Sequence, residues 1–344
     1  MHMADALLSP AVGGAMWGAA AGAIAYCSRK VRSDLDNRRV PLMGVLGAFV
    51  FAAQMINFSI PGTGSSGHLG GGLLLTILLG PHAAFLVIAS VLVVQALFFA
   101  DGGLLALGCN IFNLGFFPAF VAYPLIYRRL VVGRSGGGRE VAVTIAAAVA
   151  GLLLGALGVV LETVGSGVSA LPLSTFVLMM LPIHLAIGVV EGVVTAAVVS
   201  FVRKARPEIV ESVRETRPLA PFPMRPVLAL FFVAALLVGG LLSRFASGNP
   251  DGLEWSIARV TGKGELTAPT GGLHGAVSSL QGKLALFPDY RFKQPPAGPK
   301  PGDARSGEAE RGSGTSVAGM VGGVLTLLTA LLIGFVLKRR NTSG

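Results

Sequence analysis

The chain begins Met1-His2-Met3, and a further histidine, His68, lies in a glycine-rich stretch. A free amino terminus followed directly by His2 offers three nitrogens in succession: the terminal amine, the His2 backbone amide and the His2 imidazole. Bound to one cation they close two small chelate rings, provided that the amide loses its proton. Ni(II), Cu(II) and sometimes Co(II) can drive that loss, and Ni(II) and Cu(II) favour a planar field of nitrogens. A fourth nitrogen from elsewhere in the chain would complete a square-planar coordination.

His68 is the candidate for that fourth nitrogen. Glycines precede it at 62, 64 and 67 and follow it at 70–72. Such a loop can fold tightly over a small ligand, because glycine tolerates unusual dihedrals and close backbone approach. Asn57, Ser65 and Ser66 could orient the imidazole through hydrogen bonds. The alternative interpretation is a mobile outer loop with a solvated histidine.

The composition predicts an integral membrane protein that is all-α. Of 344 residues, 53% are hydrophobic and only 13% are charged, and several apolar runs reach the roughly 20 residues that cross a bilayer. The net charge of +10 raises the possibility of nucleic-acid binding. The basic residues gather at the ends of apolar runs, where they set orientation in the membrane. We therefore expect the lipid bilayer, and no nucleic acid, as the partner of these residues.

The apolar runs predict about nine transmembrane helices, a seven-helix bundle plus a two-helix C-terminal unit, at 10–28, 41–59, 68–79, 81–100, 107–127, 140–164, 174–202, 226–247 and 317–337. The third is short, since twelve residues rise only about 18 Å. The basic segments 29–39 and 128–139 must both be cytoplasmic, which requires three crossings between residues 60 and 127 after the span at 41–59. The protein would thus sit in the cell membrane with its amino terminus outside and its carboxyl terminus in the cytoplasm. Met1, His2 and His68 then share the outer side.

These spans fall into two units joined by a linker. Residues 1–205 are predicted to form a metal-capture transmembrane domain, and 206–225 a cytoplasmic linker rich in Pro and Arg. Residues 226–344 would form a two-span auxiliary domain around an extracytoplasmic segment at 248–316. His274 lies in that segment, where we expect it to be solvated.

Several polar residues are predicted inside the spans. His184 and Glu191 lie seven residues apart in one span and so share a helix face. Ionisable groups inside a membrane are costly and mark either function or a paired structural contact. Asn110 and Asn113 belong to the same polar interior, and both kinds of role stay open for all four residues.

The first span carries small residues every four positions, at Gly14, Gly18 and Gly22. Such a ridge lets another helix approach closely. The neighbour is either a helix of the same chain, which we expect, or a partner membrane protein. The sequence contains no Walker A motif, no HExxH and no nucleophile elbow. We therefore expect no enzyme and no ATPase site in this chain.

Four blocks in order carry a resemblance to a known family: MHMADALLSP, SSGHLGGGLLLTILLGP, LFFADGGLLALGCNIFNLG and HLAIGVVEGVVTA. They resemble the substrate-capture component of energy-coupling-factor nickel/cobalt transporters, the NikM/CbiM family, over about residues 1–205. The second unit, with NPDGLEWSIARVTG and GTSVAGMVGG, resembles the NikN-like two-span auxiliary subunit of the same systems, here fused on.

The resemblance implies that Ni(II) or Co(II) is the transported substrate, held by the Met1 amine, the His2 amide and imidazole, and His68. It also implies a separate transmembrane coupling subunit and separate ATPase subunits. Members of the family continue after Met-His in ways typical of cobalt or of nickel, whereas this chain has Met3-Ala4-Asp5. The metal is thereby left open, although the planar-nitrogen argument favours nickel.

Three functional hypotheses follow. The first is the metal-capture subunit of an ATP-driven importer. The second is a proton-coupled secondary carrier in which His184 and Glu191 relay protons. The third is a structural membrane subunit, which would bind no metal tightly.

The charge pattern makes the topology testable. Reporter fusions after residues 134 and 344 should both report a cytoplasmic location, because basic segments precede both positions. An outside location for either fusion would overturn the nine-span arrangement.

Overall fold

The computed structural model describes residues 2–34, 38–131, 137–168, 171–219, 223–263, 266, 268–293 and 304–339. Six of the described helices are long and apolar enough to cross a membrane, and the shorter α2 is also apolar. One small hairpin interrupts this helical chain. The all-α membrane class is confirmed, whereas nine crossings and the division at 206–225 stay predictions.

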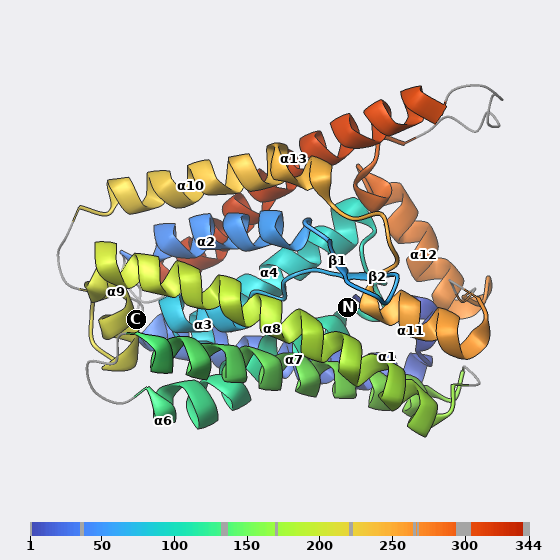
Figure 1. Ribbon diagram of the computed structural model, residues 1–344, viewed down its shortest axis with the longest axis horizontal. Helices are drawn as coiled ribbons and strands as arrows, with labels where there is room; N and C mark the ends of the chain where they lie inside the picture. The colour runs from blue at the N-terminus through green and yellow to red at the C-terminus, as the bar shows by residue number, and fades with distance from the viewer. Residues whose placement is uncertain are drawn as a thin grey trace.

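The first part of the chain forms these elements (Figure 1), in this order: η1 (Asp5–Leu7), α1 (Pro10–Asp34), α2 (Arg39–Gln54), β1 (Phe58–Ile60), β2 (Ser65–Gly67), α3 (Gly72–Leu79), α4 (Pro81–Phe99), α5 (Leu107–Ile111), η2 (Phe112–Tyr127), α6 (Arg128–Leu130), α7 (Gly138–Ser166) and α8 (Leu173–Ala205). The elements α5, η2 and α6 form one continuous helix, in which η2 is wound as a π-helix. Pro118 and Pro124 lie in η2, where their missing N–H groups interrupt the regular α-helical ladder.

The second part of the chain contributes α9 (Pro207–Arg214), α10 (Arg225–Gly240), η3 (Leu242–Phe245), α11 (Gly252–Thr261), α12 (Gly272–Leu284), η4 (Pro288–Tyr290) and α13 (Ala304–Arg339). Figure 1 shows α11 and α12 together at one end of the molecule and α9 at the other. The helices α10 and α13 both pack against α2. Their other faces expose large apolar side chains such as Val233, Leu237 and Leu332, as helices that face lipid require.

Close packing of small residues joins α2, α10 and α13. A Cβ added at Gly319 of α13 would lie 2.2 Å from the Gly239 carbonyl oxygen of α10. A Cβ at Gly322 would lie 2.0 Å from Phe51 of α2. Glycine at these two positions therefore sets how closely the three helices approach.

The region expected to hold the second and third spans differs from the prediction. Helix α2 ends at Gln54, and β1 pairs antiparallel with β2 through Phe58–Gly67, Ser59–Ser66 and Ile60–Ser65. Helix α3 then has only eight residues, which rise about 12 Å and cannot cross a bilayer alone. It still reaches α9, since a Cβ at Gly80 would lie 3.8 Å from Val213. The expected span at 68–79 is therefore wrong as a full helix.

Two further expectations are corrected by the packing. His274 is buried, and its Nε2 lies 2.9 Å from the Leu8 carbonyl oxygen, so it ties α12 to the amino-terminal segment. Gly14, Gly18 and Gly22 have no atom within 4 Å of an added Cβ in the described part of the chain. The ridge on α1 is thus open rather than packed internally.

The contact between α10 and α13 can be tested with Gly319→Ala. The new methyl would meet backbone, which cannot move aside, so the free energy of unfolding should fall by about 1–3 kcal/mol. Gly323→Ala is the matched control, because among the described residues the nearest neighbour of its new methyl would be the Ala48 carbonyl oxygen at 3.9 Å. Both variants gain the same helix propensity. Equal thermal unfolding temperatures in detergent would contradict the close approach.

Candidate metal centre

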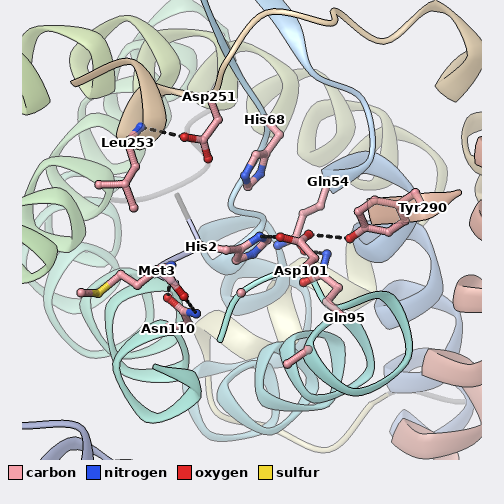
Figure 2. Close-up of polar contacts among 12 residues, drawn as sticks. His2, Met3, Gln54, His68, Gln95, Asp101, Asn110, Asp251, Leu253 and Tyr290 are labelled. Carbon is pink, nitrogen blue, oxygen red and sulfur yellow. Dashed lines mark hydrogen bonds and ion pairs between the residues drawn. The ribbon is translucent and has the colours of Figure 1, made fainter. Parts of the chain in front are cut away.

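The amino-terminal segment is buried inside the bundle. Met3 is fully buried, and its backbone N–H donates to Asn110 Oδ1 at 2.8 Å. The Asn110 amide donates in return to the Met3 carbonyl at 3.3 Å, and the Gly103 N–H donates to the same carbonyl at 2.9 Å. Asn110 of α5 therefore fixes the backbone beside His2 (Figure 2). Met1, the first predicted ligand, lies outside the described residues.

Asp101 holds the ring of His2. His2 Nδ1 lies 2.8 Å from Asp101 Oδ1, and the Tyr290 hydroxyl donates to Asp101 Oδ2 at 2.5 Å. Burial alone would raise the pKa of Asp101. The interactions with His2 and Tyr290 outweigh burial and hold that pKa below its ordinary value. The carboxylate is therefore ionised and can accept both hydrogen bonds.

His68 lies directly over His2. The two rings are stacked, with centroids 5.1 Å apart and planes inclined by 26°. His68 Nδ1 lies 3.1 Å from the Leu69 carbonyl oxygen, which places the ring proton on Nδ1 and the lone pair on Nε2. Burial lowers the pKa of His68 to about 3. The ring is therefore neutral near pH 7, the form that a metal ligand needs.

The chelate predicted at the amino terminus has a definite geometric requirement. A ring that includes the cation, the His2 amide nitrogen and the His2 side chain closes with six members only through Nδ1. Since Nδ1 faces Asp101, a cation that binds there must displace this hydrogen bond. In the described residues, no three His, Cys, Asp or Glu side chains are grouped so that they could hold a metal ion. A site at this position therefore needs backbone or terminal nitrogens as well.

The loop after His68 is held from both sides by polar side chains of the spans. Glu191 of α8 accepts the N–H of Gly70 at 2.8 Å and that of Gly71 at 3.1 Å. The Gln54 amide donates to the Gly70 carbonyl at 2.8 Å, and Gln95 donates to Gln54 at 2.8 Å. Glu191 thus positions the His68 loop.

The remaining predicted residues have other contacts. Ser66 donates from Oγ to the Asn249 carbonyl at 2.8 Å, and the Asn57 carbonyl accepts the Ser247 N–H at 2.7 Å. The Ser65 hydroxyl donates to the Ser66 carbonyl at 3.1 Å. These contacts tie the hairpin to itself and to the second part of the chain, and a role of these residues in orienting the His68 imidazole stays a prediction.

Asn113 and His184 are both buried near the site. Asn113 donates to Glu162 Oε2 at 2.7 Å and lines a small cavity with Glu191 and Gly70. His184 lines a second small cavity with His68. Glu162 is a residue that sequence reasoning missed, although a carboxylate inside an apolar run was the available signal.

Sequence reasoning also missed two residues of the second part of the chain. Asp251 turns its carboxylate toward His68, and Tyr290 holds Asp101 (Figure 2). The spacing Asp251–Glu254 is readable as the capping box that begins α11. Nothing in that spacing shows that α11 begins beside His68, which lies far away in the sequence.

Comparisons with known proteins agree with this architecture. Residues 2–209 match the family described as the cobalt uptake substrate-specific transmembrane region, and residues 225–339 match the PDGLE domain. The chain is 33% identical to the fused nickel transport protein NikMN of Rhodobacter capsulatus, over 84% of this chain and 88% of that protein. It is 33% identical to the cobalt transport protein CbiM of Sorangium cellulosum, over 64% and 99% respectively.

A solved structure supports the same comparison. The crystal structure of a transition metal transporter superposes with a TM-score of 0.54 at 31% identity, and covers 62% of this chain and 99% of that one.

The hold of Glu191 on the loop can be tested with Glu191→Gln. A glutamine offers only one acceptor oxygen and turns an NH₂ group toward one of the two amides. Loss of a hydrogen bond to a charged group costs about 1.5–3 kcal/mol. Hydrogen exchange at Gly70 and Gly71 should therefore accelerate by more than about tenfold. Glu162→Gln, which contacts Asn113 instead, should leave these amides unchanged, and equal exchange in both variants would contradict the assignment.

Proposed function

Because the chain belongs to the family of cobalt uptake substrate-specific transmembrane regions and carries a PDGLE domain, we propose that it is the metal-capture component of an ATP-driven importer of the energy-coupling-factor type. Transport of nickel or cobalt is the activity of its relatives. We propose Ni(II) as the favoured substrate and Co(II) as the alternative. The proposed ligands are the Met1 amine, the His2 amide and imidazole, and His68.

One observation carries this proposal. The fold buries Met3 and stacks the His2 ring on the neutral His68 ring at a centroid distance of 5.1 Å. Backbone nitrogens in such a place need partners away from water. A cation that takes the amine, the amide and two imidazoles as ligands would use all of them at once. Such an all-nitrogen field selects Ni(II) over oxygen-preferring divalent ions.

Coupling to ATP hydrolysis is assigned to other subunits. The chain contains no Walker A motif, so we propose that ATPase subunits act through a transmembrane coupling subunit. The open small-residue ridge of α1, at Gly14, Gly18 and Gly22, is a face on which a helix of that subunit can pack closely.

The proton-coupled carrier is the less well supported alternative. It requires that His184 and Glu191 exchange protons during transport. The Glu191 carboxylate already accepts two backbone N–H groups of the His68 loop, and this contact fits a positioning role better. Uptake that collapses with an uncoupler and needs no ATPase subunit would favour the carrier instead.

The terminal-amine site can be tested by extending the chain. Two residues, Ala-Ser, placed before Met1 would turn the amine into an amide and remove His2 from the second position. Metal analysis of the purified protein should then find no bound nickel or cobalt. His68→Ala should lower retention by more than about tenfold, a loss above about 1.4 kcal/mol.

His82→Ala is the matched control for His68→Ala. His82 packs against Tyr26 and Phe120, away from the candidate site, so retention should not change. An extended protein that still carries stoichiometric metal would show that the terminal amine is not a ligand.

A further inference from the structure

A second polar cavity lies beside the proposed metal site. Its volume is about 10 Å³, room for about one water-sized particle. Its polar walls are His68, His184 and Asp251, and Gly252 closes it. The cavity therefore lies where α8 meets the turn that begins α11.

His184 directs an unused lone pair at this region. Its Nδ1 lies 2.8 Å from the Met180 carbonyl oxygen. A carbonyl only accepts, so the ring proton is on Nδ1 and the lone pair is on Nε2. The residue is fully buried, and Nε2 has no hydrogen-bond partner among the described residues. In metal-binding histidines, one ring nitrogen likewise donates its N–H to a hydrogen-bond acceptor, and the lone pair of the other nitrogen binds the metal.

Asp251 brings a carboxylate to the same cavity from the other part of the chain. Its Oδ1 accepts the N–H groups of Leu253 at 2.8 Å and Glu254 at 2.9 Å, which fixes its orientation. The carboxylate interacts electrostatically with both His68 and His184. Figure 2 shows it turned toward His68. Nitrogen and oxygen donors thus face one small space.

The turn that carries Asp251 is docked on the His68 loop by specific contacts. The Ser66 N–H donates to the Pro250 carbonyl at 2.8 Å, and the Trp255 indole donates to the Thr63 carbonyl at 2.9 Å. A Cβ at Gly252 would lie 3.2 Å from His184 Cε1 and 2.6 Å from Ile183. Glycine therefore lets the turn rest directly on the His184 ring.

We propose that His184 Nε2 and the Asp251 carboxylate form a second, weaker site for a divalent cation, adjacent to His68. This inference rests on the proposed function. A mixed nitrogen and oxygen donor set accepts a divalent cation with less preference for Ni(II) than an all-nitrogen field has. The cation is held there first and then passes to the all-nitrogen site. The C-terminal part of the chain thereby supplies the carboxylate that loads the metal.

The site can be measured with Co(II) in full-length protein that carries His2→Ala, which removes the chelate. Co(II) should still bind, with a mixed nitrogen and oxygen coordination visible in its absorption spectrum. Asp251→Asn in this background should weaken binding by more than about tenfold. Asparagine keeps the same cap, because its side-chain oxygen accepts the same two N–H groups.

Glu254→Gln is the control, since it removes a charge from the same turn without changing the cavity walls. Affinity for Co(II) that is equal in His2→Ala with and without Asp251→Asn would overturn the second site.

Loading kinetics separate this inference from the proposed function. In the otherwise native chain, Asp251→Asn should slow Ni(II) loading by more than about tenfold and leave the final stoichiometry unchanged. Unchanged loading, with stoichiometric nickel in both proteins, would overturn the second site and leave the proposed function intact. A native chain that retains neither nickel nor cobalt would overturn the proposed function itself.

Discussion

The need to bury the backbone around Met3 inside an apolar bundle governs the rest of this structure. Backbone polar groups removed from water need partners, and residues 2–3 have no helix to provide them. Asn110 supplies both a donor and an acceptor to Met3, and Gly103 supplies a second donor. A Cβ at Gly103 would lie 1.8 Å from Asp5 Oδ1. Glycine there is a direct consequence of how closely the two segments approach.

The C-terminal part of the chain takes part in this burial. His274 contacts the Leu8 carbonyl, Tyr290 donates to Asp101, and Gln281 donates to the Gly102 carbonyl at 2.7 Å. On the opposite side, residues 247–255 hold the hairpin that leads to His68. The candidate metal centre is therefore enclosed by both parts of the chain, and its geometry depends on their packing against one another.

Much of the fold could be predicted from the sequence, because the positions of the helices depend on local patterns of apolar residues. Long apolar runs predict helices, and the helices of the structure begin and end within a few residues of most of those runs. The hairpin and the eight-residue length of α3 were missed, since the apolar runs at 41–59 and 68–79 do not show where the chain leaves the helix. The burial of His274 was not predicted, because its contact with the Leu8 carbonyl joins residues far apart in the sequence.

For the candidate site too, the sequence indicated some of the residues but not how they are brought together. His2, His68 and Glu191 were found from residue types that are costly or unusual where they occur. Their pairing required the whole bundle, and no sequence pattern places Asp251 against His68 or Tyr290 against Asp101. Asp101 and Asp251 lie far apart in the sequence, yet both face this pair of histidines (Figure 2). Long-range packing, rather than local propensity, decides which charges surround the metal.

X-ray absorption spectroscopy at the nickel edge, on the full-length protein with an unmodified amino terminus, tests the central claim most directly. The account predicts a planar, four-coordinate spectrum with nitrogen neighbours only, because the amine, the amide and two imidazoles fill the field. A six-coordinate spectrum dominated by oxygen neighbours would contradict it and would show that the amino terminus does not chelate the cation.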